Sequence, residues 1–493
     1  MSRVVLFFPK SEERDIVLLP ASVLMVAAPL VKDGYEVKII DQRVEKEWES
    51  VILEEIKKNP LAFGVSALTG KQILNGLEAS KLVKKNSNIP VVWGGVHASL
   101  LPAQTLENKY IDFVVVGEGE EIFLELAESF KNKKPLENIK GLGYKKNGKV
   151  FVNPPRDFIN LDKTAEIPYQ LIDIEKYIGK KSFASGKIGR NLTFYTSRGC
   201  PHRCGFCYNK EFNKGRWRAK SAERVFSEIK ELVGKYRVDS FEIEDDEFFV
   251  NTERAGKICE LIISGGLNIE IFASCRVNYV VNNMDDAYLR LLHRAGFRTL
   301  AFGVESGSER ILDLMHKDIS ISQVFETIKR LKKIGINSKY YFIAGFPTET
   351  VDDLYKTTDL IYEMKKLDPN IRIPAWRVFT PYPGTDLFGV SLAQGWQPPK
   401  TLEEWANYDF NTVRMPWIDG KKKGIIENAA FLINYLEIEG TEGRGLFFFL
   451  AKIFGKLTRL HWVGHKFSFV PEKYAINLFL KLKKSLTFFK DKD

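Results

Sequence analysis

The sequence predicts an α/β protein in which two series of alternating strands and helices are followed by a helical region. Short runs rich in β-branched residues recur through the first 130 residues and again from 190 to 390, with helical patterns between them. After about residue 390 the pattern becomes helical, aromatic and basic. A chain of 493 residues is also too long for one ordinary core, so several domains are expected.

The first series predicts a doubly wound parallel sheet. Its strand-like runs are bounded by Gly, Pro or Asp, as buried parallel strands are, and cover residues 3–9, 35–41, 61–67, 89–95 and 112–119. Helical patterns lie between them, at residues 20–33, 47–58, 71–86 and 119–132. In such a sheet, ligands bind beyond the carboxyl ends of the strands.

Glycines and small polar residues gather where three of these strands end. The clusters are Ser66 with Thr69, then Gly94, Gly95, Val96 and His97, then Gly117, Glu118 and Gly119. Glycine there lets a large flat ligand approach the backbone closely. The alternative is that these glycines only turn the chain. The presence of three such clusters at successive strand ends argues against that alternative.

The second series predicts an open, partial barrel. Its strands are expected at residues 192–196, 240–244, 269–273, 299–304, 339–345 and 373–379. The helix predicted over 320–334 carries an apolar stripe that can cover a sheet. Six βα units fall short of the eight of a closed ring, and the chemistry is again expected at the carboxyl ends of the strands.

These patterns divide the chain into four parts. We place an α/β domain at 1–140, a linker at 141–189, the partial barrel at 190–390 and a helical region at 391–493. The linker contains a predicted hairpin around Asn147-Gly148.

Three of the five cysteines stand at C-x3-C-x2-C spacing, as Cys200, Cys204 and Cys207. An odd cysteine count in so long a chain argues against a disulfide framework and favours a reducing compartment. Structural zinc needs four ligands, and Cys259 and Cys275 lie far away and apart. Three thiolates on a tight loop instead fit a 4Fe–4S cluster with one open iron.

With these cysteines at the first strand of a barrel, residues 190–390 resemble a radical SAM enzyme. The resemblance implies that the open iron binds S-adenosylmethionine (SAM), whose reductive cleavage gives a 5′-deoxyadenosyl radical. It rests also on "EIEDDEFF" (242–249), "ASCRVN" (273–278), "GVESGSERILDLMHK" (303–317) and "FIAGFPTET" (342–350). It implies SAM contacts at Phe206, Glu244, Asp245, Arg276, Glu305, Ser306 and Gly345.

The first domain resembles the cobalamin-binding domain of the cobalamin-dependent radical SAM subfamily, through Ser66, "WGGVHAS" (93–99) and "VVGEGEE" (115–121). The resemblance implies that the three clusters at the strand ends contact cobalamin. The D-x-H-x-x-G motif that supplies an axial histidine to cobalt elsewhere is absent. His97 is the only histidine of this domain, and we expect it to contact the corrin edge.

The resemblance favours a radical C-methyltransferase that acts on an unactivated carbon of a hydrophobic substrate such as a lipid or pigment. The alternatives are an anaerobic oxidative ring cyclase of magnesium-protoporphyrin monomethyl ester and another lipid-modifying radical reaction. A non-enzymatic metal-binding module is less favoured. A tRNA methylthiotransferase would need a second cysteine trio, whereas residues 1–199 contain no cysteine.

The formal charge of +10, with an excess of basic residues near the C-terminus, is consistent either with anionic partners or with a solvated lysine-rich face. The aromatic, basic segments 443–462 and 473–484 predict helices that pack on the barrel or contact a membrane surface. We expect a cytoplasmic enzyme that is reduced by ferredoxin or flavodoxin and binds no nucleic acid. The apolar run near the N-terminus is a strand rather than a signal peptide.

Overall fold

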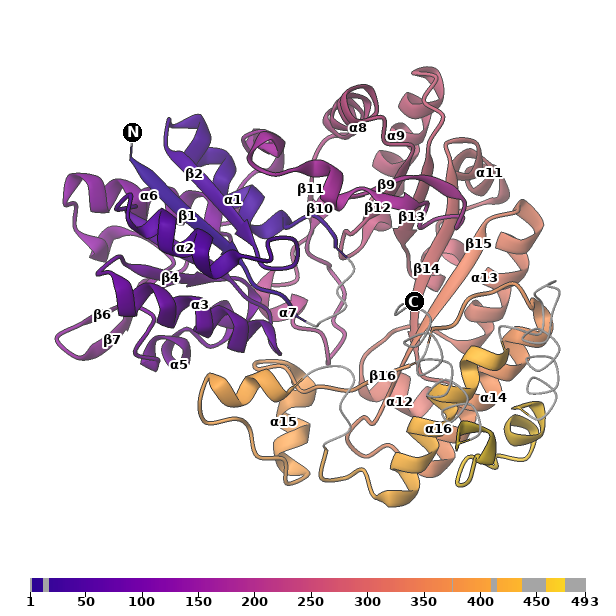
Figure 1. Ribbon diagram of the computed structural model, residues 1–493. Coiled ribbons are helices and arrows are strands. Elements are labelled where there is room, and N and C mark those ends of the chain that lie inside the picture. The colour runs from indigo at the N-terminus through magenta and orange to yellow at the C-terminus, as the bar shows by residue number, and fades with distance from the viewer. Residues whose placement is uncertain (1, 12–16, 375, 409–414, 437–457, 475–493) are drawn as a thin grey trace, which may run out of the picture.

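The computed structural model describes the chain except for residues 1, 12–16, 375, 409–414, 437–457 and 475–493. Figure 1 shows two α/β lobes, an indigo-to-purple one at the N-terminal end and a magenta-to-orange one after it. Each lobe is built around its own sheet. The predicted fold class, a doubly wound domain followed by a partial barrel, is therefore confirmed.

The first sheet has the strand order β2-β1-β3-β4-β5-β6-β7. Its parallel strands are β1 (Arg3–Phe8), β2 (Glu36–Asp41), β3 (Ala62–Ser66), β4 (Val91–Gly94) and β5 (Phe113–Val115). All were predicted, but β5 ends earlier than expected because Gly117 turns the chain with φ +88°. Since β1 lies between β2 and β3, the winding reverses at β1 and β3, which is where open α/β sheets bind ligands.

Helices cover both faces of this sheet. On one face lie α1 (Ala21–Lys32) and α6 (Gly119–Asn132), and on the other α2 (Trp48–Ile56) and α3 (Gln72–Asn86). Alternate residues of β1 point to opposite faces: Val4 and Leu6 pack in one core cluster, Val5 and Phe7 in the other. Burial on both faces explains why this strand is a continuous apolar run.

Two short helices, α4 (Val96–Leu100) and α5 (Pro102–Glu107), follow β4 and were not predicted, because so few residues show no helical period. The predicted hairpin is confirmed as β6 (Leu142–Lys146) and β7 (Lys149–Val152), with Asn147 and Gly148 both at positive φ. It extends the first sheet by pairing antiparallel to β5.

The second sheet has the order β16-β15-β14-β13-β12-β9-β8. Its parallel strands are β9 (Ile188–Phe194), β12 (Ser240–Ile243), β13 (Glu270–Ser274), β14 (Phe297–Glu305), β15 (Asn337–Ala344) and β16 (Arg377–Val378). At one edge, β8 (Gly179–Lys181) pairs antiparallel to β9. In the described part of the chain the edge strands β8 and β16 do not pair, so the barrel is open as predicted.

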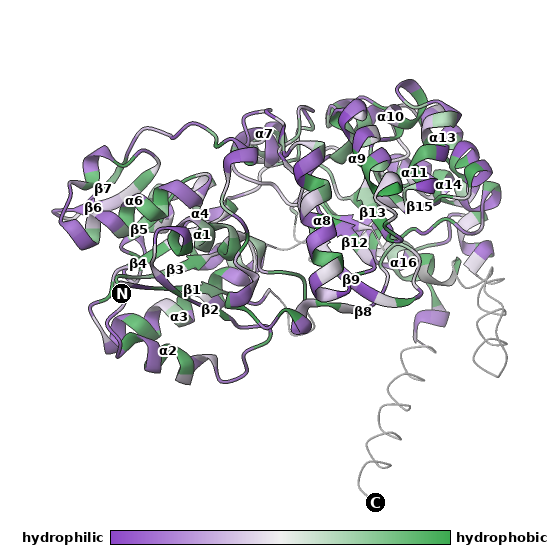
Figure 2. Cartoon of the chain, turned by 90° about the horizontal axis from the view of Figure 1, so that it is seen from above, coloured by the Kyte–Doolittle hydropathy of each residue, from purple (hydrophilic) through white to green (hydrophobic). Residues whose placement is uncertain are grey.

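Helices cover the outside of the second sheet (Figure 1): α8 (Ala222–Tyr236), α9 (Thr252–Ser264), α11 (Asp286–Arg294), α13 (Ile321–Ile334) and α14 (Val351–Leu367). The predicted stripe on α13 is buried at Val324, Ile328 and Leu331. In Figure 2 hydrophobic residues are concentrated in the central strands of the first lobe, while hydrophilic residues lie on the β6–β7 hairpin and on the outer helices.

After the barrel the chain returns to the first lobe through α15 (Asp386–Ala393) and the short 3-10 helix η6 (Glu403–Asn407). Trp405 of η6 is buried in the core of the first lobe, where its Nε1 donates to Gln104 Oε1 at 2.8 Å. Next, α16 (Gly420–Leu436) packs against α14. The predicted segments 443–462 and 473–484 lie mostly outside the described residues. Within the described ranges, no helix combines the length and apolarity that a bilayer span requires.

We expect Trp405→Ala to destabilise the first lobe, although Trp405 lies 301 positions after its hydrogen-bond partner Gln104 in the sequence. Removing a fully buried tryptophan costs about 3–5 kcal/mol, and Trp405 is 1% exposed. The measurement is the urea midpoint of unfolding of the first lobe, which is followed through the hydrogen exchange of the amides of β3 and β4. Phe151→Ala, at a side chain 42% exposed, is the control and leaves the unfolding midpoint nearly unchanged. Equal midpoints for both variants would contradict this packing role.

Candidate functional site

A cavity of about 580 Å³ lies between the two lobes, at the carboxyl ends of strands from both sheets. On the side of the first lobe it is lined by residues that follow β3, β4 and β5. On the side of the barrel it is lined by Tyr195, Tyr208 and the acidic residues after β12. We call it the interdomain cavity.

Most of the predicted cobalamin residues line this cavity. The ones that do are Ser66, Gly94, Gly95, Val96, Gly117, Glu118 and Gly119. A Cβ atom added at Gly117 would meet nothing within 4 Å, and one at Gly94 nothing closer than 3.7 Å. Gly94 and Gly117 therefore leave an open floor above the backbone at two strand ends, which fits a large flat group such as a corrin.

His97 and Thr69 lie elsewhere. His97 is fully buried; Thr69 Oγ1 lies 3.0 Å from its Nδ1, and its ring packs against Trp405 with centroids 5.7 Å apart. Burial lowers the pKa of His97 to about 4, so the ring is neutral at pH 7. Neither residue lines the interdomain cavity; His97 is buried and Thr69 half-buried.

The predicted cluster loop runs between β10 (Ser197–Arg198) and α7 (Asn209–Phe212), at the first strand of the barrel. Cys204 is buried, while Cys200 and Cys207 are partly exposed. The loop is held to the barrel by Gly205, whose N–H donates to the Met315 carbonyl at 2.8 Å. Strand order thus brings the three thiols to the rim of the sheet.

These thiols fit a multi-iron cluster. Within the described residues, no three His, Cys, Asp or Glu side chains gather closely enough to hold one metal ion. Thiolates that bind different irons of one cluster do not need to converge on a single point. Burial raises the pKa of Cys200 to about 11 and of Cys207 to about 12. Iron binding must therefore displace their protons.

Two buried cations lie beside Cys204. The Arg276 guanidinium is 3.6 Å from the Cys204 sulfur through Nη1 and donates through Nη2 to the Lys317 carbonyl. Lys317 Nζ pairs with Glu305 Oε1 at 2.9 Å. Burial would lower the pKa of Lys317, but the Glu305 carboxylate raises it, so the ammonium stays charged. Positive charge here offsets the negative charge that deprotonated thiolates bring.

The acidic residues after β12 have separate environments. Asp245 is buried and accepts hydrogen bonds from the Thr196 N–H and Ser197 Oγ, each at 2.6 Å. Asp246 Oδ2 accepts from the Gly199 N–H at 2.8 Å. Both carboxylates therefore fix the chain that leads into the cysteine loop. Glu244 also lines the interdomain cavity, where it follows the carboxyl end of β12.

Of the remaining predicted SAM residues, Phe206 lies in the cysteine loop, and Ser306 and Gly345 follow β14 and β15. Phe206 packs on Phe346 with ring centroids 6.0 Å apart, and Lys317 Nζ is 5.7 Å from its centroid. Ser306 is fully buried. Gly345 follows β15 at φ +84° and donates its N–H to Glu349 Oε2 at 2.6 Å. Gly345 and Ser306 therefore shape strand ends.

Glu242 and Glu244 form a carboxyl pair on β12 and just after it. Burial and the neighbouring Glu244 carboxylate raise the pKa of Glu242 to about 8, and the pKa of Glu244 is also raised by burial. Two close carboxyls share a proton in this way because two negative charges so close together repel each other. The sequence analysis did not identify Glu242, whose only signal is its spacing of two from Glu244.

The other two cysteines have different surroundings. Cys259 is fully buried on α9 in the apolar core, and burial raises the pKa of its thiol to about 12. Cys275 follows β13, and its sulfur lies 3.4 Å from the Arg276 carbonyl. Sequence reasoning also assigned no role to Lys317, Arg198 and Arg218, because the residue type alone does not show which carboxylate a basic side chain will meet.

Comparisons with known proteins agree with this geometry. The model of the radical SAM superfamily matches residues 194–361, and the model of the B12 binding domain matches residues 15–127. An uncharacterized methyltransferase of Pyrococcus horikoshii is 37% identical over 375 residues, which cover 75% of this chain and 78% of that protein. The chain belongs to the radical SAM superfamily. It is a radical SAM enzyme with an N-terminal B12-binding domain.

Two further similarities cover most of this radical SAM enzyme. The anaerobic magnesium-protoporphyrin IX monomethyl ester cyclase of Rubrivivax gelatinosus is 29% identical over 378 residues, 75% of this chain and 65% of that one. The structure of OxsB, a cobalamin-dependent SAM radical enzyme, matches with a TM-score of 0.74 at 18% identity, over 98% of this chain and 75% of that one. The cofactors are thus a 4Fe–4S cluster, SAM and cobalamin.

We expect Gly199→Ala to impair cluster binding. Gly199 precedes Cys200 at φ +87°, and an added Cβ would lie 2.0 Å from the Arg216 carbonyl oxygen. The clash displaces the loop, so iron bound after anaerobic reconstitution should fall by about tenfold or more. Gly215→Ala is the control, because Gly215 also has positive φ (+65°) but its Cβ would meet nothing within 4 Å. Equal iron contents in the two variants would contradict this role of Gly199.

We expect Glu242→Gln to change how stability depends on pH. A carboxyl whose pKa rises from 4.5 unfolded to about 8 folded binds more protons when folded, so it lowers stability as the pH rises between these values. The variant lacks this loss. Its urea midpoint should match that of the wild type near pH 4 and exceed it increasingly up to pH 8. A constant difference across this range would show that Glu242 titrates normally.

Proposed function

We propose that this radical SAM enzyme is a cobalamin-dependent C-methyltransferase that acts on an unactivated carbon of a hydrophobic substrate. One observation carries the proposal: the carboxyl ends of both sheets line the same interdomain cavity. A corrin on the floor formed by Gly94 and Gly117 would face the end of the barrel that bears the cysteine loop. Methyl transfer to a substrate radical needs both cofactors at one substrate.

The residues of the two lobes would have distinct tasks. We assign Cys200, Cys204 and Cys207 to the cluster, and Arg276 and Lys317 to the stabilisation of its charge. When bound, the cluster and SAM supply hydrogen-atom abstraction, and cobalamin supplies a transferable methyl group. Glu244 lines the cavity and would face SAM or substrate there, and its neighbour Glu242 keeps a proton near neutral pH.

The substrate class is supported by a second cavity of about 790 Å³, next to the interdomain cavity. The two cavities share Met25, Glu120, Tyr195, Ser197 and Arg198 as wall residues. Apolar side chains such as Leu124, Phe158 and Ile167 line the second cavity together with basic and acidic ones. This combination favours an amphipathic molecule with a hydrophobic body and a polar group. Electron supply by ferredoxin or flavodoxin remains part of the proposal.

A second candidate is an oxidative ring cyclase. It is supported by the 29% identity to the magnesium-protoporphyrin monomethyl ester cyclase of Rubrivivax gelatinosus. Both candidates begin with hydrogen abstraction from the substrate and differ in the fate of the substrate carbon. Methylation adds one carbon from SAM, whereas cyclisation adds none.

The test uses SAM with a deuterated methyl group. Anaerobically reconstituted enzyme with cobalamin and a reductant is incubated with lipid and pigment extracts, and products are analysed by mass spectrometry. We expect a product that carries the labelled methyl group, and none with Cys204→Ala, which lacks a proposed cluster ligand. Cys259→Ala keeps the activity, because its thiol lies in the apolar core. An oxidised product without label would favour the cyclase.

A further inference from the structure

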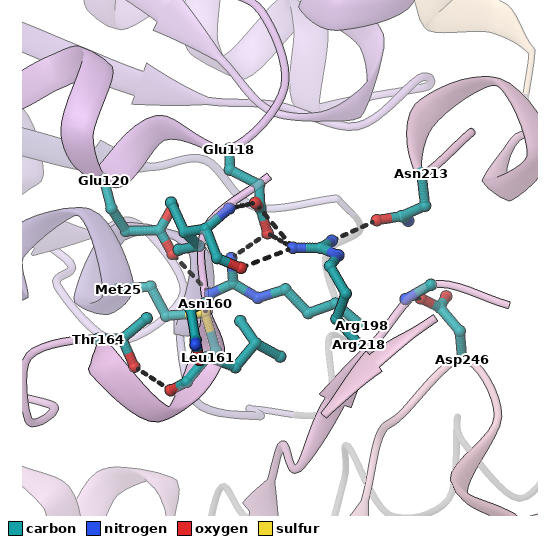
Figure 3. A network of polar contacts seen from close by, with 12 residues as sticks. Met25, Glu118, Glu120, Asn160, Leu161, Thr164, Arg198, Asn213, Arg218 and Asp246 are labelled. Carbon is teal, nitrogen blue, oxygen red and sulfur yellow. Dashed lines mark hydrogen bonds and ion pairs between the residues drawn. The ribbon is translucent and has the colours of Figure 1, made fainter. Parts of the chain in front are cut away.

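Glu118 lies at the junction of the two lobes, in the loop between β5 and α6. Its carboxylate accepts hydrogen bonds from Arg198 Nη1 at 2.7 Å and from Arg218 Nη1 at 2.8 Å, both on the barrel side (Figure 3). It also accepts from the Ile159 N–H at 3.0 Å. At 6% exposure of its side chain, Glu118 uses its acceptors within the protein rather than toward a cofactor.

The two arginines stand directly opposite each other. Arg198 of β10 pairs in register with Arg218 of β11 (Arg218–Ala219) in a short antiparallel ribbon. Like charges opposite each other destabilise a strand pair. Glu118 and Glu120 offset the repulsion between the two arginines, since Arg198 also donates a hydrogen bond to Glu120 Oε1 at 2.5 Å. The ribbon of the barrel thus depends on carboxylates that the first lobe supplies.

This ribbon leads straight into the cysteine loop, because Arg198 stands two residues before Cys200. Arg218 is fixed as well, with its guanidinium carbon 4.2 Å from the centroid of the Phe158 ring and Nη2 bonded to Asn213 Oδ1 at 3.0 Å. Asn213 follows α7, which ends the cysteine loop. Glu118 is therefore linked to both ends of that loop, as the arrangement in Figure 3 shows.

On the other side, Glu118 is flanked by Gly117 and Gly119, which line the floor of the interdomain cavity. Burial would raise the pKa of Glu118, but Arg198 and Arg218 together lower it, so the carboxylate is charged at neutral pH. A charged group with two guanidinium partners holds its place far better than a neutral one. The same few residues therefore belong to the cobalamin floor and to the support of the cluster.

We propose that Glu118 is a positioning residue: with Arg198 and Arg218 it forms an ionic clamp that fixes the cobalamin floor against the cysteine loop and so sets the spacing between the two cofactors. The proposal rests on the proposed function, in which both cofactors serve one cavity. It differs from the sequence-based expectation, in which Glu118 contacts cobalamin.

The test compares Glu118→Gln with a matched control, Glu55→Gln. Glu55 is likewise a buried carboxylate with two cationic partners, Arg3 and Lys58, but all three belong to the first lobe. Holoenzyme with cobalamin in the cob(II)alamin state and a reduced cluster carries two paramagnetic centres. Pulsed electron paramagnetic resonance gives the distribution of distances between them.

We expect a narrow distribution in the wild type and in Glu55→Gln, and a clearly broadened or shifted one in Glu118→Gln. Cobalamin should bind to all three proteins in equal amounts. Glu118→Asp, which keeps the charge, should restore part of the narrow distribution. A Glu118→Gln protein that loses cobalamin, or one with an unchanged distribution, would overturn the proposal.

Hydrogen exchange provides a measurement that needs no cofactor. The amides of Ser197, Arg198 and Ile159 should exchange about tenfold faster in Glu118→Gln than in the wild type. In Glu55→Gln their exchange rates should equal those of the wild type. If the wild type takes up no cobalamin, the proposed function fails, while faster exchange in Glu118→Gln alone still supports the clamp. Equal exchange in both variants would overturn it.

Discussion

The polarity of parallel strands is the constraint on which this structure depends. In both lobes the strands deliver loops, glycines and charged side chains to one edge of the sheet, and the two edges meet at the interdomain cavity. The glycines at the strand ends of the first lobe, and the position of the cysteine loop at the first strand of the barrel, follow from strand order. Neither lobe contains both.

Bringing these edges together places several charges out of water, and each must be compensated. Arg276 and Lys317 stand beside Cys204 with Glu305 as a counter-ion, Asp245 and Asp246 are held by the chain before the cysteines, and the Glu242 carboxyl keeps a proton. The junction of the lobes also contains apolar packing, because one core cluster includes residues of both lobes, such as Leu24 and Phe194, and Trp405 packs in the core of the first lobe.

Much of the fold was predictable because burial produces simple sequence patterns. Parallel strands buried on both faces are continuous apolar runs, and helices such as α13 carry an apolar stripe on their buried face. The strand "RVVLFF" and the stripe on α13 are local signals that tertiary structure did not override. Pairings over long distances left no such signal. Neither the attachment of the hairpin to β5 nor the position of Trp405 against His97 shows in the sequence, because each depends on where a distant segment returns.

The candidate site was predictable only where a residue type has one dominant chemistry. Three cysteines at fixed spacing indicate a metal cluster, and glycines at strand ends indicate a close approach to the backbone. An arginine or glutamate, by contrast, can pair with many different groups. Arg276 matched a motif, yet its guanidinium contacts Asn278, Cys204 and the Lys317 carbonyl; Glu118 matched another, yet its carboxylate faces two arginines. The motif of Glu118 placed it at the wall of the interdomain cavity, but neither motif indicated the partners that the fold provides. Charged residues acquire their role from the counter-charges that the fold brings to them, so at this junction the two sheets define the chemistry of each side chain as much as the side chain itself does.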